Sequence, residues 1–159
     1  MPIPLDAIVR QIIALLVRDG RASAAELSRA LDDVSERTVR YRVERLLRDG
    51  VMRISAVVSP LAVGYRVITD VFVEVRPGEV EQVALRLAAC EHVSYVAASI
   101  GKGDLSIQVC ARDEAELTRI VGEVVESIPG VRHTKTALVP WKLKDVYEWQ
   151  IPPEAADVT

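Results

Sequence analysis

Apolar residues in the first fifty positions recur at the spacing of short amphipathic helices. The pattern predicts one helix over 7–19, with Gly20 ending it. Its apolar face consists of Ile8, Ile12, Leu15 and Leu16. A second helix begins after Ser23, because the sequence Ser-Ala-Ala-Glu over 23–26 has the form of a capping box. Its inward-facing residues are Leu27, Ala30 and Leu31.

A third helix is predicted over 35–48, with Ser35 as its N-cap and Gly50 just beyond its end. Its apolar stripe consists of Val39, Val43, Leu46 and Leu47. At about 100° per residue, the opposite side carries arginine, threonine and tyrosine. Residues 32–34 leave only a short turn before this helix. The second and third helices therefore form a predicted helix-turn-helix.

The outer face of the third helix has the chemistry of a DNA-reading helix. Arginine can pair with guanine or phosphate, threonine and tyrosine can form hydrogen bonds, and a helix fits the major groove. We predict that DNA is contacted by Arg21, Ser35, Glu36, Arg37, Thr38, Arg40, Tyr41, Arg45 and Arg48. Among these, Arg21 and Arg48 are the expected phosphate contacts. An ordinary solvated face is the alternative interpretation of the same pattern.

The chain changes character after residue 50. Residues 51–58 have the apolar composition of a β-strand, and Ser59 and Pro60 end that strand. We interpret residues 51–66 as a linker strand that connects two domains.

Strand and helix patterns alternate beyond residue 66. Strands are predicted over 67–75, 93–100, 105–111 and 131–139, and helices over 79–89 and 114–128. This βαββαβ order is the ferredoxin-like arrangement. The predicted fold class is α+β: a winged helix-turn-helix domain over 1–50, a ferredoxin-like βαββαβ domain over 67–150, and a tail over 151–159.

The predicted sheet carries helices on one face only, so its other face must meet solvent or a partner. Tyr95 and Ala97 alternate with Val96 and Ala98, and neither face of that strand is fully polar. Association through the sheet would cover the free face. We therefore expect a twofold-symmetric homodimer that uses residues 51–58 and the sheets.

The net charge of −3 argues against a generic nucleic-acid binder. Positive charge is instead local, because residues 35–48 hold five arginines and two glutamates. The 109 residues after position 50 hold eleven basic and fifteen acidic side chains. The basic third helix belongs to an otherwise acidic protein. We therefore expect a single subunit to bind double-stranded DNA weakly and in a salt-sensitive way.

Cysteine use and hydropathy set the expected compartment. Cys90 and Cys110 lack C-x-x-C spacing, which favours buried thiols over a disulfide or metal site. No segment approaches the roughly 20 apolar residues of a membrane span. The N-terminus has no basic region typical of a signal peptide. We expect a cytoplasmic protein with no membrane partner, metal or cofactor.

Gly101, Lys102, Gly103 and Asp104 lie between the second and third predicted strands along the chain. Glycine supplies positive φ, so a plain tight turn explains the sequence, and the spacing alone favours that interpretation. In the functional alternative, the glycines let a ligand approach the backbone while Asp104 accepts a hydrogen bond from an amine.

From about Leu5 to Trp149 the chain resembles the Lrp/AsnC (feast/famine) family of transcriptional regulators. The resemblance rests on Asp19-Gly20-Arg21, on Ser35-Glu36-Arg37-Thr38-Val39, and on the Gly101-x-Gly103-Asp104 hairpin. It implies a regulator that forms dimers, often assembled into octamers. It also implies pockets between subunits for amino acids or related small effectors. The implied effector-binding residues are Gly101, Lys102, Gly103, Asp104, Thr134 and Thr136.

Three positions depart from the family pattern. Val9 stands where a second aspartate is common, residues 32–34 replace a turn usually written with Gly-Leu, and Lys102 replaces a common aromatic residue. A cation at Lys102 would favour a ligand carboxylate, or would simply be solvated.

Two other functions fit parts of the sequence. An architectural DNA-compacting protein without an effector would share every predicted helix. An enzyme similar to the sirohaem decarboxylases would need His92 and His133, the only two histidines, to serve a tetrapyrrole. His92 follows a helix end and His133 lies within a strand, so both have ordinary explanations. We find no paired-carboxylate site or metal-ligand spacing and predict no enzyme.

Overall fold

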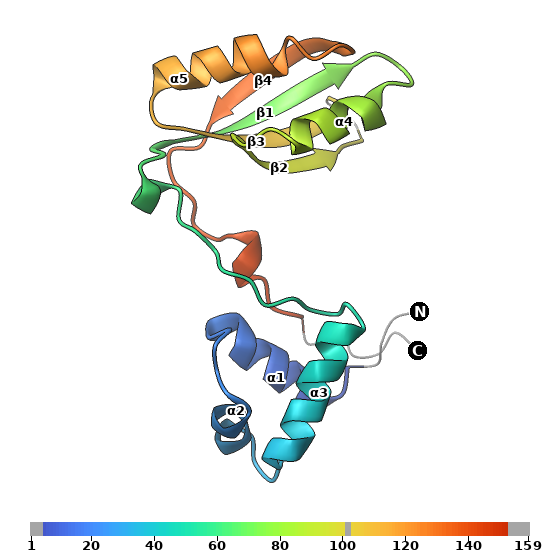
Figure 1. Cartoon of the computed structure of the whole chain (residues 1–159), viewed down its shortest axis with the longest axis vertical. Coiled ribbons are helices and arrows are strands. Elements are labelled where there is room, and N and C mark those ends of the chain that lie inside the picture. The colour runs from blue at the N-terminus through green and yellow to red at the C-terminus, as the bar shows by residue number, and fades with distance from the viewer. Residues whose placement is uncertain (1–4, 101–102, 153–159) are drawn as a thin grey trace. The chain divides into compact units, whose positions relative to one another are not determined.

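A computed structural model of the chain describes residues 5–100 and 103–152. Contacts within the chain define two units. The first combines Met1–Val57 with the residues from Leu143 onward, and the second is Val58–Lys142 (Figure 1). The expected second domain extended to residue 150. The structure instead groups residues 143–152 with the first unit.

The first unit contains the three predicted helices: α1 over Ala7–Arg18, α2 over Ala24–Ala30 and α3 over Glu36–Arg48. Each begins at a side-chain cap. Asp6 caps α1, Ser23 forms the predicted capping box with Glu26, and Ser35 accepts the Thr38 N–H. These caps satisfy backbone N–H groups that have no partner inside a helix. The helix-turn-helix prediction is confirmed.

A small apolar core joins the three helices. Its buried members are Val9, Ile12, Leu16, Leu27, Leu31, Val39 and Leu46. Two predicted inward positions are wrong, since Ala30 is exposed and Leu47 is 39% exposed. Ala30 ends α2, and Leu47 lies at the edge of the α3 stripe. A core of this size covers only the centre of each apolar face.

Residues 51–58 form no β-strand in the structure of the single chain, so the predicted linker strand is wrong for the single chain. A strand needs a hydrogen-bonded neighbour, and the described residues of this chain supply none beside this segment. The apolar side chains that favoured the prediction remain uncovered: Ile54 is 50%, Val57 59% and Val58 65% exposed.

The C-terminal segment packs on α1. Tyr147 lines a hollow of about 270 Å³ together with Ile13 and Val17 of that helix. Further along, Nη1 of Arg10 donates a hydrogen bond of 3.0 Å to the carbonyl oxygen of Pro152. These contacts explain why the segment belongs to the first unit.

The second unit begins with a short 3-10 helix, η1 over Leu61–Val63, and continues as a four-stranded antiparallel sheet with three helical elements. Its elements are β1 over Val67–Val75, α4 over Val80–Ala88, β2 over Val93–Ala98, β3 over Leu105–Ala111, α5 over Glu114–Arg119, η2 over Ile120–Val125 and β4 over Val131–Leu138. The strand order is β2-β3-β1-β4. The predicted βαββαβ arrangement is confirmed.

The two faces of the sheet differ in character. Residues opposite each other across an antiparallel ladder point to the same face. Val71 of β1 lies opposite Ile107 of β3, and both are buried with Leu87 of α4 in one apolar cluster. The opposite face, here called the open face, carries Phe72 and Tyr95, which are 38% and 54% exposed. The sheet therefore leaves apolar surface uncovered in the single chain.

The last helix is α-helical over α5 and becomes a π-helical turn over η2, in place of the single α-helix predicted over 114–128. Glu116 in α5 is the one charged side chain that is buried among the described residues. Nε and Nη2 of Arg112 donate to its carboxylate at 3.0 and 2.6 Å. These hydrogen bonds lower the pKa of Glu116 to about 2. The charged carboxylate thereby ties the start of α5 to the end of β3.

Candidate nucleic-acid interface and effector site

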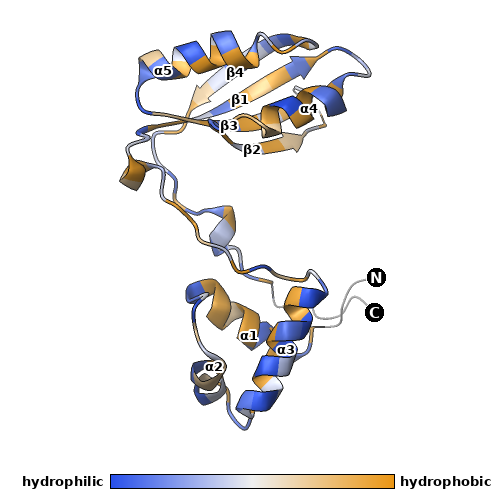
Figure 2. Ribbon diagram, viewed as in Figure 1, coloured by the Kyte–Doolittle hydropathy of each residue, from blue (hydrophilic) through white to orange (hydrophobic). Residues whose placement is uncertain are grey.

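The outward face of α3 carries its reactive groups in accessible positions. Tyr41 is 60% exposed, Arg37 is exposed, and Thr38 is half-buried beside them. Val39 and Leu46 on the other side of the helix are buried. In Figure 2, hydrophilic positions dominate the ribbon of α3, whereas hydrophobic positions dominate that of α1. Five of the predicted DNA-contact residues therefore lie on one accessible side of α3: Arg37, Thr38, Tyr41, Arg45 and Arg48.

The arginines of α3 differ in their ion pairs. Arg40 pairs with Glu36 at 2.5 Å, one turn away. Arg45 and Arg48 both reach Asp49, at 3.4 and 3.1 Å. No ion pair of Arg37 occurs in the described part of the chain. Exposed pairs of this kind are worth at most about 1 kcal/mol, so phosphate can displace them.

Ser35 and Thr38 form a small hydroxyl pair at the N-terminus of α3. The Ser35 hydroxyl accepts the Thr38 N–H at 3.2 Å, and the two side-chain oxygens lie 2.8 Å apart. Ser35 therefore has a structural task as a cap, besides any contact with DNA. Arg21 lies in the turn between α1 and α2, away from this helix in sequence, with its side chain exposed.

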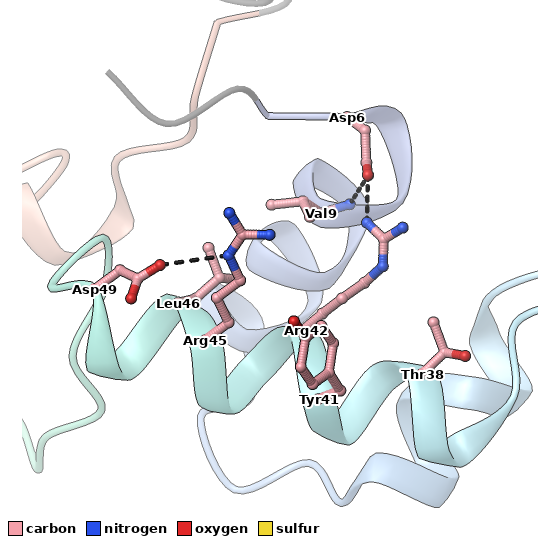
Figure 3. A pocket seen from close by; sticks show the side chains of 8 residues that line it. All are labelled: Asp6, Val9, Thr38, Tyr41, Arg42, Arg45, Leu46 and Asp49. Carbon is pink, nitrogen blue, oxygen red and sulfur yellow. Dashed lines mark hydrogen bonds and ion pairs between the residues drawn. The ribbon is translucent and has the colours of Figure 1, made fainter. Parts of the chain in front are cut away.

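A hollow of about 300 Å³ lies between α1 and α3 (Figure 3). Asp6 on the α1 side and Arg42 on the α3 side form an ion pair across it. The hydrogen bond from Arg42 holds the pKa of Asp6 below its usual range, and the N–H of Val9 adds to this. This ion pair was not predicted from the sequence. The position of Asp6 just before a helix is a local sign of a cap. Its pairing with Arg42, which lies 36 residues away, leaves no pattern in the sequence.

The predicted effector loop is partly described. Gly101 and Lys102 lie outside the described residues. Gly103 has a φ of +88°. This value lies in the left-handed region, which glycine adopts without steric cost. The Asp104 carboxylate accepts the N–H of Val75 at 2.7 Å, and the Asp104 N–H donates to the carbonyl oxygen of Val73 at 3.0 Å. Asp104 therefore holds the loop against the end of β1, where the ladder to β4 shifts register.

Thr134 and Thr136 do not meet Asp104 within one chain. They lie opposite Val73 and Val71, on the face that carries the helices. The Thr134 hydroxyl donates to Glu126 at 2.5 Å. The strand β1 separates β4 from β3, so the threonines stand two strand spacings, or about 10 Å, from the loop.

Neither a metal cluster nor a membrane helix is found in residues 5–100 and 103–152. No group of three or more metal-ligating side chains occurs there. None of the helices described is long and apolar enough to cross a bilayer.

Comparisons with known proteins agree with this architecture. A family model described as winged helix-turn-helix DNA-binding matches residues 5–51, and one described as Lrp/AsnC ligand binding domain matches residues 70–148. An uncharacterized HTH-type transcriptional regulator of Pyrococcus abyssi is 38% identical over 92% of this chain and 90% of its own length. The HTH-type transcriptional regulator FL11 of the same organism is 32% identical over 95% of this chain and 99% of its own.

Solved structures show the same fold. E. coli AsnC superposes with a TM-score of 0.81 at 22% identity, covering 88% of this chain and 95% of AsnC. A feast or famine regulatory protein from M. tuberculosis, complexed with L-methionine, gives a TM-score of 0.84 at 26% identity, covering 93% and 99% of the two chains.

The fold and its relatives define a DNA-binding regulator with a separate ligand-binding domain. The chain belongs to the Lrp/AsnC family of transcriptional regulators. The predicted family and the α+β fold class are thereby confirmed. Both of the Pyrococcus abyssi relatives are transcriptional regulators by name.

The hydrogen bond from Val75 to Asp104 should contribute to the stability of the second unit. Replacing Asp104 by Ala leaves the part-buried N–H of Val75 without its acceptor, which should lower the free energy of unfolding by about 1–3 kcal/mol. Asp104→Asn retains an acceptor oxygen and should cost clearly less. Urea denaturation followed by circular dichroism measures both. Equal losses in the two variants would show that the hydrogen bond to β1 is not what Asp104 contributes.

Proposed function

We propose that this regulator reads DNA bases with the outer face of α3 and that a small amino-acid-like effector alters its assembly or DNA binding. The supporting observation is the position of Arg37. Arg37 is exposed in the first turn of α3, and no carboxylate pairs with it among the described residues. Buried apolar residues on the opposite side of α3 hold the helix in place. The N-terminal turns of a recognition helix are where base edges are reached.

Arg37 is the proposed base-reading residue, beside Thr38 and Tyr41. Arg37→Ala should weaken binding of a preferred duplex by about 1–3 kcal/mol and reduce the preference for that duplex over random DNA. Arg48→Ala is the matched comparison, because a phosphate contact should weaken all duplexes alike and reduce the salt slope. The duplex is selected from a random pool by the wild-type protein, and binding is measured by fluorescence anisotropy. Unchanged affinity and preference in Arg37→Ala would remove α3 from the role proposed here.

For the effector we propose a pocket at the loop of Gly101, Lys102, Gly103 and Asp104, completed by Thr134 and Thr136 of a neighbouring subunit. The regulators from M. tuberculosis and Neisseria meningitidis have both been solved as complexes with L-methionine. The separation of the threonines from Asp104 within one chain favours a pocket shared by two chains. Asp104 is a suitable partner for the ammonium group of an amino acid.

A thermal-shift screen of the twenty amino acids tests the effector proposal. A ligand at 100 times its dissociation constant adds about 2.7 kcal/mol of stability, which should raise Tm by several degrees. Asp104→Asn should remove that increase while keeping the fold. If no amino acid shifts Tm, the effector proposal fails, and an architectural DNA-compacting protein becomes the better account.

We further propose a homodimer as the minimum unit, with higher assembly up to an octamer following the family. Phe72 and Tyr95 on the open face, and Val57 and Val58 in the connection, leave apolar side chains that a second copy would cover. The proposed site of action is the cytoplasm, where DNA is available. Multi-angle light scattering at micromolar concentration should give at least twice the chain mass of 17.5 kDa. A compact monomer at that concentration would contradict this proposal.

A further inference from the structure

Arg42 is tied to another helix, unlike the other paired arginines of α3. Arg40 pairs within α3, and Arg45 and Arg48 pair with the residue that follows it. Arg42 instead pairs with Asp6, 36 positions earlier. Its side chain is 25% exposed, whereas that of Arg40 is 62% exposed. The environment of Arg42 therefore differs from that of the other arginines of α3.

Asp6 has two bonding tasks with its two carboxylate oxygens. Oδ1 accepts the N–H of Val9 at 2.8 Å and so caps α1, while Oδ2 accepts a hydrogen bond from Nη1 of Arg42. The cap fixes the carboxylate relative to α1. The guanidinium extends from the middle of α3. One residue thus connects the beginning of α1 to α3 across the hollow in Figure 3, whose α3 wall includes Tyr41 and Thr38.

The pair also changes how much positive charge α3 can offer to DNA. An arginine whose charge is matched by a neighbouring carboxylate has less to gain from a phosphate. Asp6 has an additional stabilising partner, since it lies at the positive N-terminal end of α1. The Asp6 side chain is 55% exposed, but its capping bond to α1 holds the carboxylate in place, which makes its displacement by phosphate harder than the displacement of Glu36 from Arg40.

We propose that Asp6 is a positioning residue for DNA recognition, which holds Arg42 away from the DNA backbone and fixes the orientation in which α3 presents Arg37, Thr38 and Tyr41. The inference rests on the proposed placement of α3 against DNA. It adds a source of selectivity, because a freed Arg42 would bind phosphate on any sequence, and a loosened α3 would align less well with bases.

Asp6→Asn is the primary test. Asparagine caps helices about as well as aspartate, so α1 is retained while the charge that holds Arg42 is lost. The salt dependence of binding to random DNA should become steeper by about one phosphate contact per subunit, a slope change near 0.9. The preference for the selected duplex should fall about fivefold or more, the lower end of the loss of one base contact.

Asp32→Asn is the matched control. Asp32 is an exposed residue of the turn before α3, away from the outward face of that helix, with no ion pair among the described residues, and the substitution removes the same unit of negative charge. It reports the general electrostatic effect on the salt slope without releasing Arg42. If Asp6→Asn and Asp32→Asn change slope and preference equally, Asp6 has no positioning role.

Arg42→Gln separates positioning from direct contact. Under the proposal it lowers the preference for the selected duplex but leaves the salt slope at the wild-type value, since Arg42 does not touch phosphate in the wild-type protein. The double variant Asp6→Asn with Arg42→Gln should also return to the wild-type slope. A slope reduced by about 0.9 in Arg42→Gln would overturn the proposal, because it would identify Arg42 as a phosphate contact. Failure of the α3 assignment itself would appear separately, as an unchanged Arg37→Ala.

Discussion

The burial of Val39 and Leu46 against the other two helices of the first unit is the constraint on which the proposed reading function depends. Both residues are at most 4% exposed. Because successive helical residues are separated by about 100°, fixing these two side chains fixes the direction of every other side chain of α3. Arg37 and Tyr41 are thereby turned outward. A helix with the same composition but a different apolar register would bury one of them.

Electrostatics then determines how much of the outward face can act on DNA. The sequence shows five arginines over residues 35–48, yet four of them have carboxylate partners in the structure. Three of those pairs are local and exposed, and DNA phosphate can replace their carboxylates at little cost. The fourth connects two helices. The positive charge available for nonspecific binding is therefore smaller than the count of arginines indicates, which favours selectivity over affinity.

Much of the fold could be predicted because its signals are local. Caps at Ser23 and Ser35 lie within a few residues of the groups that they satisfy, and the buried valines of β1 alternate with period two. The predicted strand over 51–58 failed for the opposite reason. Its composition was suitable, but a strand is defined by a partner, and no neighbouring segment of the described chain pairs with it.

The candidate sites were predicted in part, for the same physical reason. Periodicity gave the outward face of α3, and the glycine of the loop does need positive φ. The bonds that determine what the side chains do join distant positions: Asp6 with Arg42, and Asp104 with Val75. Neither spacing nor composition contains information on such pairs. Asp104 thus proved to be an anchor of β1 as well as a candidate ligand contact.

In the proposed function, the outer face of α3 is the surface that meets DNA. Titration of isotopically labelled protein with the selected duplex, followed by chemical shifts of backbone amides, tests it most directly. We expect the largest changes at the amides of Arg37, Thr38 and Tyr41, and little change at the amides of β1 to β4. Changes concentrated on the sheet, with the amides of α3 unmoved at saturation, would contradict it.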